Sequence, residues 1–112
     1  MIALQLRRPP MKVSRLEDTP AKEGHGGAVI REVITDKDGA PNFAMRVIEV
    51  KPGAATPSHN HPWEHEVFIL SGRAVVKGEK GEAEISKNNV VYIPPNEHHC
   101  FESIGDEPLR FV

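Results

Sequence analysis

Hydrophobic and β-branched residues occur along this chain in short runs, separated by glycines, prolines and charged clusters. Ten prolines and nine glycines are spread over 112 residues, which leaves little room for a helix of ordinary length. The runs between them are rich in Val, Ile, Phe and Thr, a composition typical of strands. They predict eight strands, at residues 28–35, 43–50, 66–70, 74–77, 82–85, 90–93, 100–103 and 109–112.

The spacing of these strands predicts an all-β fold. Clusters of turn-forming residues at Asp36–Gly39 and Gly78–Gly81 can close hairpins, and short strands at regular spacing indicate a sandwich or barrel. The length is enough for one domain, which we expect to span residues 28–112. Residues 1–27, which are rich in proline and end in a glycine-rich stretch, are interpreted as an extended N-terminal arm of undetermined conformation.

Composition excludes several classes of partner. A net charge of -2 provides no basic surface for nucleic acid. The apolar runs are too short to span a bilayer or to form a secretory signal. The single cysteine, Cys100, cannot form an internal disulfide and fits a reducing compartment, so a cytoplasmic protein without membrane contact is expected.

The histidines carry the candidate chemistry. Five of the six fall in two short stretches, residues 59–65 and 98–99. Residues two apart in an extended segment project to the same side, so His59 and His61 can direct both imidazoles at one point, and His99 can join them from a distant strand. Imidazole is a common ligand of divalent transition metals. Alternation allows only one of His65 and Glu66 to point at the same ion.

The spacing of these residues resembles the two sequence motifs of the cupin superfamily. The first motif is matched by Gly53, His59, His61, His65 and Gly72, with His65 where the family usually has Glu. The second is matched by Pro94, Asn96 and His99, with Asn88 at the leading glycine and Ser103 at the usual asparagine. Asn tolerates a positive φ better than other non-glycine residues, so Asn88 and Asn96 are expected to make the turns of the glycines they replace. The chain is also similar to small single-domain cupins with a four-histidine manganese site.

This resemblance implies a double-stranded β-helix, the cupin or jelly-roll barrel. It implies that His59, His61, His65 and His99 hold one divalent transition metal, with Glu66 as the rival of His65. Manganese is favoured, while Fe, Co, Ni, Cu and Zn also suit imidazole ligands. Barrels of this type commonly pair at their edges, so a homodimer is expected, and the arm could cover an open edge strand.

The function implied is that of a metal-dependent oxidoreductase, dioxygenase-like, which acts on a small organic substrate such as a phenol or diketone. The alternative is a non-catalytic module that binds metal and a small ligand; isomerase or lyase chemistry ranks last. Two residues are candidates for the substrate pocket. Arg46 either forms an outer salt bridge or orients an anionic or phenolic substrate, and Phe101 either belongs to the barrel core or lines the pocket. No catalytic residue is identified.

Overall fold

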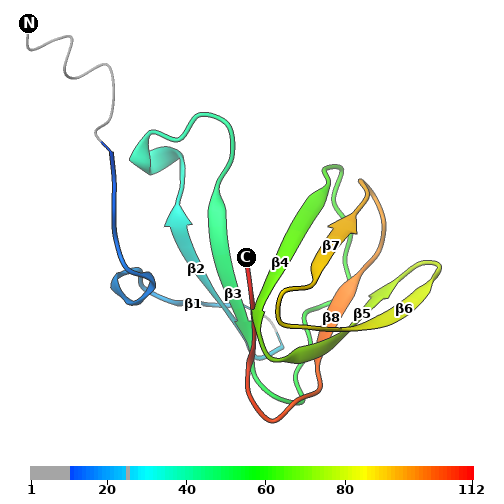
Figure 1. The fold of residues 1–112 in the computed structure, drawn as a ribbon. Coiled ribbons are helices and arrows are strands. Elements are labelled where there is room, and N and C mark those ends of the chain that lie inside the picture. Colours follow the sequence, from blue (N-terminus) through cyan, green and yellow to red (C-terminus); the bar gives the residue numbers. More distant parts are fainter. Residues whose placement is uncertain (1–10, 25) are drawn as a thin grey trace, which may run out of the picture.

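A computed structural model describes residues 11–24 and 26–112 (Figure 1). It contains the 3-10 helices η1 (Leu16–Asp18) and η2 (Asp36–Asp38) and the strands β1 (Lys22–Glu23), β2 (Ala28–Ile34), β3 (Met45–Val50), β4 (His65–Ser71), β5 (Arg73–Gly78), β6 (Gly81–Ser86), β7 (Val90–Ile93), β8 (Cys100–Ser103) and β9 (Leu109–Phe111). Among the described residues no helix is long and apolar enough to cross a membrane. The predicted all-β fold class is confirmed.

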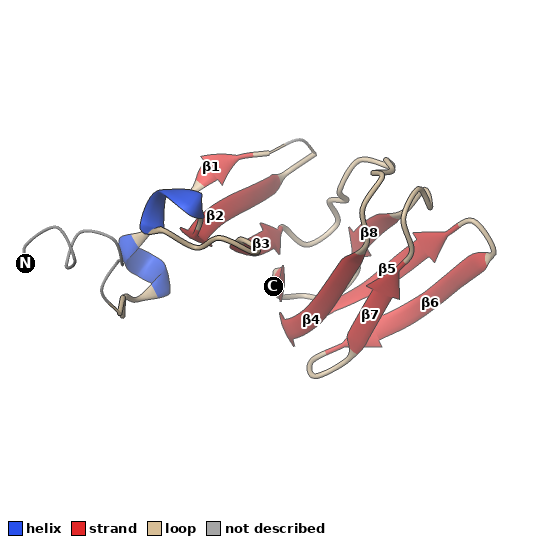
Figure 2. Ribbon diagram, turned by 90° about the horizontal axis from the view of Figure 1, so that it is seen from above, coloured by secondary structure: helices blue, strands red, loops and turns tan. Residues whose placement is uncertain are grey.

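The strands form two antiparallel sheets that enclose one core. The first sheet has the order β1-β2-β3-β9-β4-β7 and the second the order β6-β5-β8. Figure 2, seen from above, shows β1 and β2 at one end of the molecule and β5, β6 and β8 at the other. The buried cluster takes Val50, Ile69 and Leu109 from the first sheet and Ala74 and Phe101 from the second. Apolar contact between facing sheets therefore holds the barrel together.

All eight predicted strands are present. The bounds of β7 and β8 are those predicted, and the other six strands differ by one or two residues at an end. The sequence did not predict β1, which lies in the proposed arm and pairs with β2 through Lys22 opposite Ile30 and Glu23 opposite Val29. Both residues of β1 are exposed, so the strand leaves no alternation of apolar and polar positions to detect.

The described part of the arm packs against its own chain. Besides the pairing of β1 with β2, the Arg31 guanidinium donates to the carbonyl oxygen of Thr19 at 2.7 Å. The edge of β2 is thus covered, as the sequence suggested, from within the same chain. Residues 1–10 and His25 of the arm lie outside the described residues. The boundary at residue 27 and pairing with a partner subunit stay predictions.

Two predicted turns are confirmed by their backbone angles. Asn88 has φ 73° and Asn96 has φ 70°, the left-handed conformation that the motif normally assigns to glycine. Ser103, at the motif's asparagine, is 1% exposed, and its backbone exchanges hydrogen bonds with residues 53 and 54. Its hydroxyl oxygen has no recorded partner, and the structure gives no reason for a hydroxyl at this position.

Candidate metal centre and adjoining cavity

The four candidate histidines come from three segments of the chain that meet at one end of the barrel. His59 and His61 lie on the connection between β3 and β4, His65 begins β4, and His99 lies directly before β8. His59 and His99 form an antiparallel backbone bridge, with N to O distances of 3.2 and 3.0 Å. The bridge places residues 40 positions apart in the sequence side by side.

A second set of hydrogen bonds holds the loop before His99. The Asn96 amide donates to the carbonyl oxygen of His61 at 2.5 Å, and the Asn60 side-chain amide donates to the carbonyl oxygen of Asn96 at 3.2 Å. The left-handed Asn96 therefore connects the loop that carries His99 to the segment that carries His61. Asn60 turns away from the imidazoles, as its alternation with His59 and His61 predicted.

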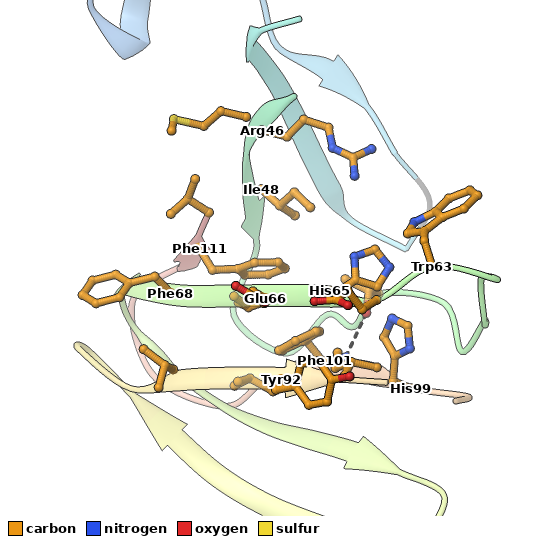
Figure 3. Close-up of a pocket in the computed structure, with 18 of the residues that line it drawn as sticks. Arg46, Ile48, Trp63, His65, Glu66, Phe68, Tyr92, His99, Phe101 and Phe111 are labelled. Atoms are coloured by element: carbon orange, nitrogen blue, oxygen red, sulfur yellow. Dashed lines mark hydrogen bonds between the residues drawn. The ribbon is translucent and has the colours of Figure 1, made fainter. Parts of the chain in front are cut away.

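The four imidazole rings lie close to one another. Ring centres are 4.6 Å apart for His59 and His61 and also for His59 and His99, 5.1 Å for His61 and His65, and 5.3 Å for His65 and His99. His61 and His99 are the widest recorded pair, at 6.2 Å. Figure 3 shows His65 and His99 close together at one end of the cavity. The structure thus brings together all four histidines that the sequence singled out.

Hydrogen bonds fix the tautomer of two of these rings. The Nδ1 atom of His59 lies 2.6 Å from the carbonyl oxygen of Pro57, and that of His99 lies 2.9 Å from the carbonyl oxygen of Glu97. A carbonyl oxygen only accepts, so each Nδ1 carries the proton and each Nε2 keeps a free lone pair. Backbone carbonyls orient metal-ligating histidines in the same way.

His65 presents a buried nitrogen without a partner. Its Nε2 atom is inaccessible to solvent and has no hydrogen-bond partner. Burial, followed by the charges of His99 and His61, lowers the pKa of His65 from 6.5 to about 4. Burial also lowers the pKa of His61, with contributions from His59 and His99. Both rings are therefore held neutral at pH 7, the state in which imidazole binds a metal.

These residues fit a metal ion by ring spacing and by donor chemistry. An ion about 2.1 Å from a ligating nitrogen lies roughly 3.2 Å from the ring centre, so neighbouring rings would be about 4.5–5.2 Å apart and opposite rings about 6.4 Å. The observed separations of 4.6–6.2 Å agree with this range. Within residues 11–24 and 26–112, no three His, Cys, Asp or Glu side chains are already in the geometry of a metal site. We infer that the rings would turn slightly to ligate an ion.

The rival ligand, Glu66, lies on the other face of β4. Val67 and Ile69, which share the face of His65, are buried, while Glu66 and Phe68 are exposed. Glu66 lines the adjoining cavity together with Glu64, and the hydrogen bond between the two is the main cause that raises the pKa of Glu64. The geometry therefore favours His65 as the residue of β4 that faces the other imidazoles.

A cavity of about 910 Å³ adjoins the histidines. Its walls come from β3, β4, β7, β8 and β9, and both pocket candidates line it. Phe101 is 4% exposed and stacks on Phe111 at 4.7 Å between ring centres, so it serves both the core and the cavity wall. Arg46 has no ion pair among the described residues.

Trp63 and Tyr92, which the sequence did not assign to the site, also line the cavity. Trp63 stacks on His61 with ring centres 4.8 Å apart and an angle of 4° between the planes, and Tyr92 projects from β7. Both are more than half exposed. The only sequence signal for Trp63 was its position two residues after His61. The alternation of β7 left no signal that Tyr92 would face a cavity.

Comparison with known proteins agrees with this fold and site. Residues 46–112 match the family model of the cupin domain. This chain belongs to the cupin family. The predicted barrel type is thereby confirmed, since solved cupins share the whole architecture.

Three similar proteins illustrate the range of the family. The polyketide cyclase RemF from Streptomyces resistomycificus has a structure with a TM-score of 0.84 and 30% identity, covering 91% of this chain and 76% of that one. Oxalate decarboxylase OxdC of Bacillus subtilis is 34% identical over 92% of this chain. Mannose-1-phosphate guanylyltransferase RfbM of Salmonella typhimurium is 40% identical over 67% of it. This cupin spans only 28% of the decarboxylase and 16% of the guanylyltransferase.

Two carboxylates connect the loop before His99 to the β5–β6 turn. The Glu79 amide donates to the Glu97 carboxylate at 3.2 Å, and the His98 amide donates to the Glu79 carboxylate at 2.9 Å. A Cβ atom on Gly78 would lie 2.5 Å from the Glu97 carboxylate, so glycine makes room for this contact. The carbonyl oxygen of Glu97 in turn faces Nδ1 of His99. The reciprocal pair thus positions His99.

We therefore predict that Glu97→Ala lowers the affinity for Mn²⁺ and Zn²⁺ by about tenfold, because loss of support behind a ligand typically costs that much or more. The measurement is competition with a metal chelator at constant pH. Glu82→Ala is the control, since Glu82 is exposed on the neighbouring β6. Equal affinities for the two variants would contradict a role for the carboxylate pair in positioning His99.

The lowered pKa of His65 predicts a pH dependence of stability in the metal-free protein. Between about pH 6.5 and 4 the unfolded chain binds a proton at His65 that the folded chain does not. The free energy of unfolding should therefore fall as the pH falls from 6.5 toward 4 and show no further contribution from this group below that. Urea titrations at several pH values across this range should show that the free energy of unfolding depends less on pH in His65→Gln than in wild type. His98→Gln is the control, and an equal pH dependence in wild type and His65→Gln would contradict the prediction.

Proposed function

We propose that this cupin is a metal-dependent enzyme that acts on a small organic substrate, with dioxygenase-like oxidation as its first candidate reaction. The observation that supports the proposal is the convergence of four imidazoles at the end of an apolar cavity. Two of the rings have Nδ1 directed at a carbonyl oxygen, and a third has a buried, unpartnered Nε2. Such donors suit a metal ion better than a hydrogen-bond network.

His59, His61, His65 and His99 would hold one divalent transition metal. When bound, the ion would supply Lewis acidity and coordination positions for oxygen donors of the substrate or for dioxygen. Four neutral imidazoles cancel none of its charge, which favours electrophilic activation of a bound group. Manganese is the favoured ion from the sequence resemblance, with Fe, Co, Ni, Cu and Zn as the other candidates. The apolar wall around Phe101 would exclude water from the bound substrate.

The second candidate reaction is a cyclisation without net oxidation. It is favoured by the similarity to a polyketide cyclase, which covers 91% of this chain. A conjugated carbonyl compound bound through oxygen would suit either reaction, because a Lewis acid polarises carbonyl groups. The two candidates differ in their need for dioxygen.

We further propose that the protein is a cytoplasmic homodimer. Six large apolar side chains that line the cavity are at least 40% exposed, namely Phe43, Met45, Trp63, Phe68, Val90 and Tyr92. An exposed apolar surface of this kind commonly marks an interface. Light scattering on the purified protein should give twice the mass of the 12.4 kDa chain. A monomer at micromolar concentration would contradict the dimer.

Metal analysis and oxygen uptake test the proposed function together. Protein purified without added metal should contain close to one equivalent of divalent transition metal, and His99→Ala should lose most of it. His98→Ala is the matched control, because His98 is adjacent and exposed whereas His99 is 5% exposed. Oxygen consumption is then measured with phenols and β-diketones.

The outcomes separate the candidate reactions. Metal-dependent oxygen uptake that is lost in His99→Ala supports the oxidoreductase. Consumption of the substrate under nitrogen, where no dioxygen is available, supports cyclisation. A metal-loaded protein that binds these compounds without changing them would be the non-catalytic module. Equal metal contents in His98→Ala and His99→Ala would overturn the metal centre itself.

A further inference from the structure

Arg46 differs from every other arginine in the described part of the chain. Arg15, Arg73 and Arg110 each pair with a carboxylate, and Arg31 donates to backbone carbonyls. Arg46 has no recorded hydrogen bond or ion pair among the described residues. A guanidinium carries five donors in a planar fork, so an arginine beside a cavity with none of them engaged is available to a ligand.

The acid expected to neutralise Arg46 is engaged elsewhere. Glu32 lies directly opposite Arg46 in the pairing of β2 with β3. Its carboxylate instead accepts from the Lys22 ammonium at 2.5 Å, and this contact is the main cause that lowers the pKa of Glu32. Lys22 belongs to β1, so the pairing of the arm with β2 is what supplies the competing cation.

Arg46 is also the only lysine or arginine that lines the cavity within the described residues. Figure 3 shows its side chain extending from β3 toward the end of the cavity where Trp63 and His65 lie. Below it, the wall is formed by Ile48 and by the stacked rings of Phe101 and Phe111. The cavity also holds the carboxyl groups of Glu64 and Glu66, whose hydrogen bond to each other raises the pKa of Glu64. The Arg46 guanidinium, beside aromatic and aliphatic wall residues, matches a ligand with a flat carbon skeleton and one acidic group.

We propose that Arg46 is a specificity-determining residue that binds the acidic group of a planar, conjugated organic anion, whose ring system lies against Phe101 and Phe111. The inference rests on the proposed function, because it names the substrate class of the same cavity. The guanidinium fork would pair with a carboxylate through two parallel hydrogen bonds. The site thereby selects an anion over a neutral compound of the same shape.

The test compares 2-naphthoate with its neutral isostere 2-naphthamide, by calorimetry and by quenching of the fluorescence of Trp63. Both probes are titrated into metal-free and into Mn²⁺-loaded protein. Wild type should bind naphthoate about tenfold more tightly than naphthamide, since a hydrogen bond between charged groups is worth about one order of magnitude in affinity. Arg46→Gln should remove this preference and leave the affinity for naphthamide unchanged. Arg46→Lys should keep part of it, because lysine retains the charge without the fork.

Arg73→Gln is the matched control, since Arg73 is exposed and pairs with Glu84 on the neighbouring strand. It should preserve the preference for naphthoate. Equal affinities for the two probes in wild type, absence of saturable naphthoate binding at millimolar concentration, or an unchanged preference in Arg46→Gln would each overturn the inference. So would naphthoate binding that requires the metal and ignores the Arg46 substitution.

The titrations of metal-free protein separate this inference from the proposed function. If metal-free wild type prefers naphthoate to naphthamide and Arg46→Gln does not, the role of Arg46 is supported even where no ion binds to the histidines. Metal binding with oxygen uptake but no selection would overturn the role of Arg46 alone.

Discussion

The backbone bridge between His59 and His99 is the contact on which the candidate site depends. Its two hydrogen bonds, of 3.2 and 3.0 Å, close a loop that contains β4, β5, β6 and β7. The carbonyl oxygens of Pro57 and Glu97 each orient the Nδ1 atom of the histidine two residues later, so the bridge brings together two rings that local contacts orient. The cost in chain entropy of closing so long a loop is met by the pairing of the enclosed strands and by the apolar core.

The sequence predicted those parts of the fold that depend on local pattern. Strands with apolar alternation were found almost to the residue, and Asn88 and Asn96 adopt the positive φ that their places in the motif required. The two-residue β1 was missed because neither of its residues is buried. Convergence of the imidazoles followed from the spacing of His59 and His61 and from the order of the strands. Their tautomers could not be predicted, since these depend on which carbonyl oxygens the folded loops place beside each ring.

The role of Arg46 shows a second limit of prediction from the sequence. From the sequence alone, an outer salt bridge and a ligand contact were equally plausible, because the sequence does not say which carboxylate lies beside Arg46. The choice depends on Lys22, which reaches Glu32 only because β1 pairs with β2. A strand without a recognisable pattern therefore decides which cation pairs with Glu32. Such dependence of one ion pair on another cannot be read from a single sequence, because it requires the register of three strands.

Charge balance connects the metal centre with the cavity. The four imidazoles contribute no negative charge, and Glu66, the one carboxylate that could have replaced His65, lies on the opposite face of β4 and interacts with Glu64. A divalent ion at the histidines would therefore keep its full charge at its ligands, while the Arg46 guanidinium and the carboxyl groups of Glu64 and Glu66 line the same cavity. A wall of aromatic and aliphatic side chains screens charge less than water does, so a charge beside it attracts counter-charge more strongly than it would in free solution. The proposed anionic ligand would thus find a counter-charge both at the ion and at Arg46, and a phenol or a diketone would gain the same interactions by losing a proton.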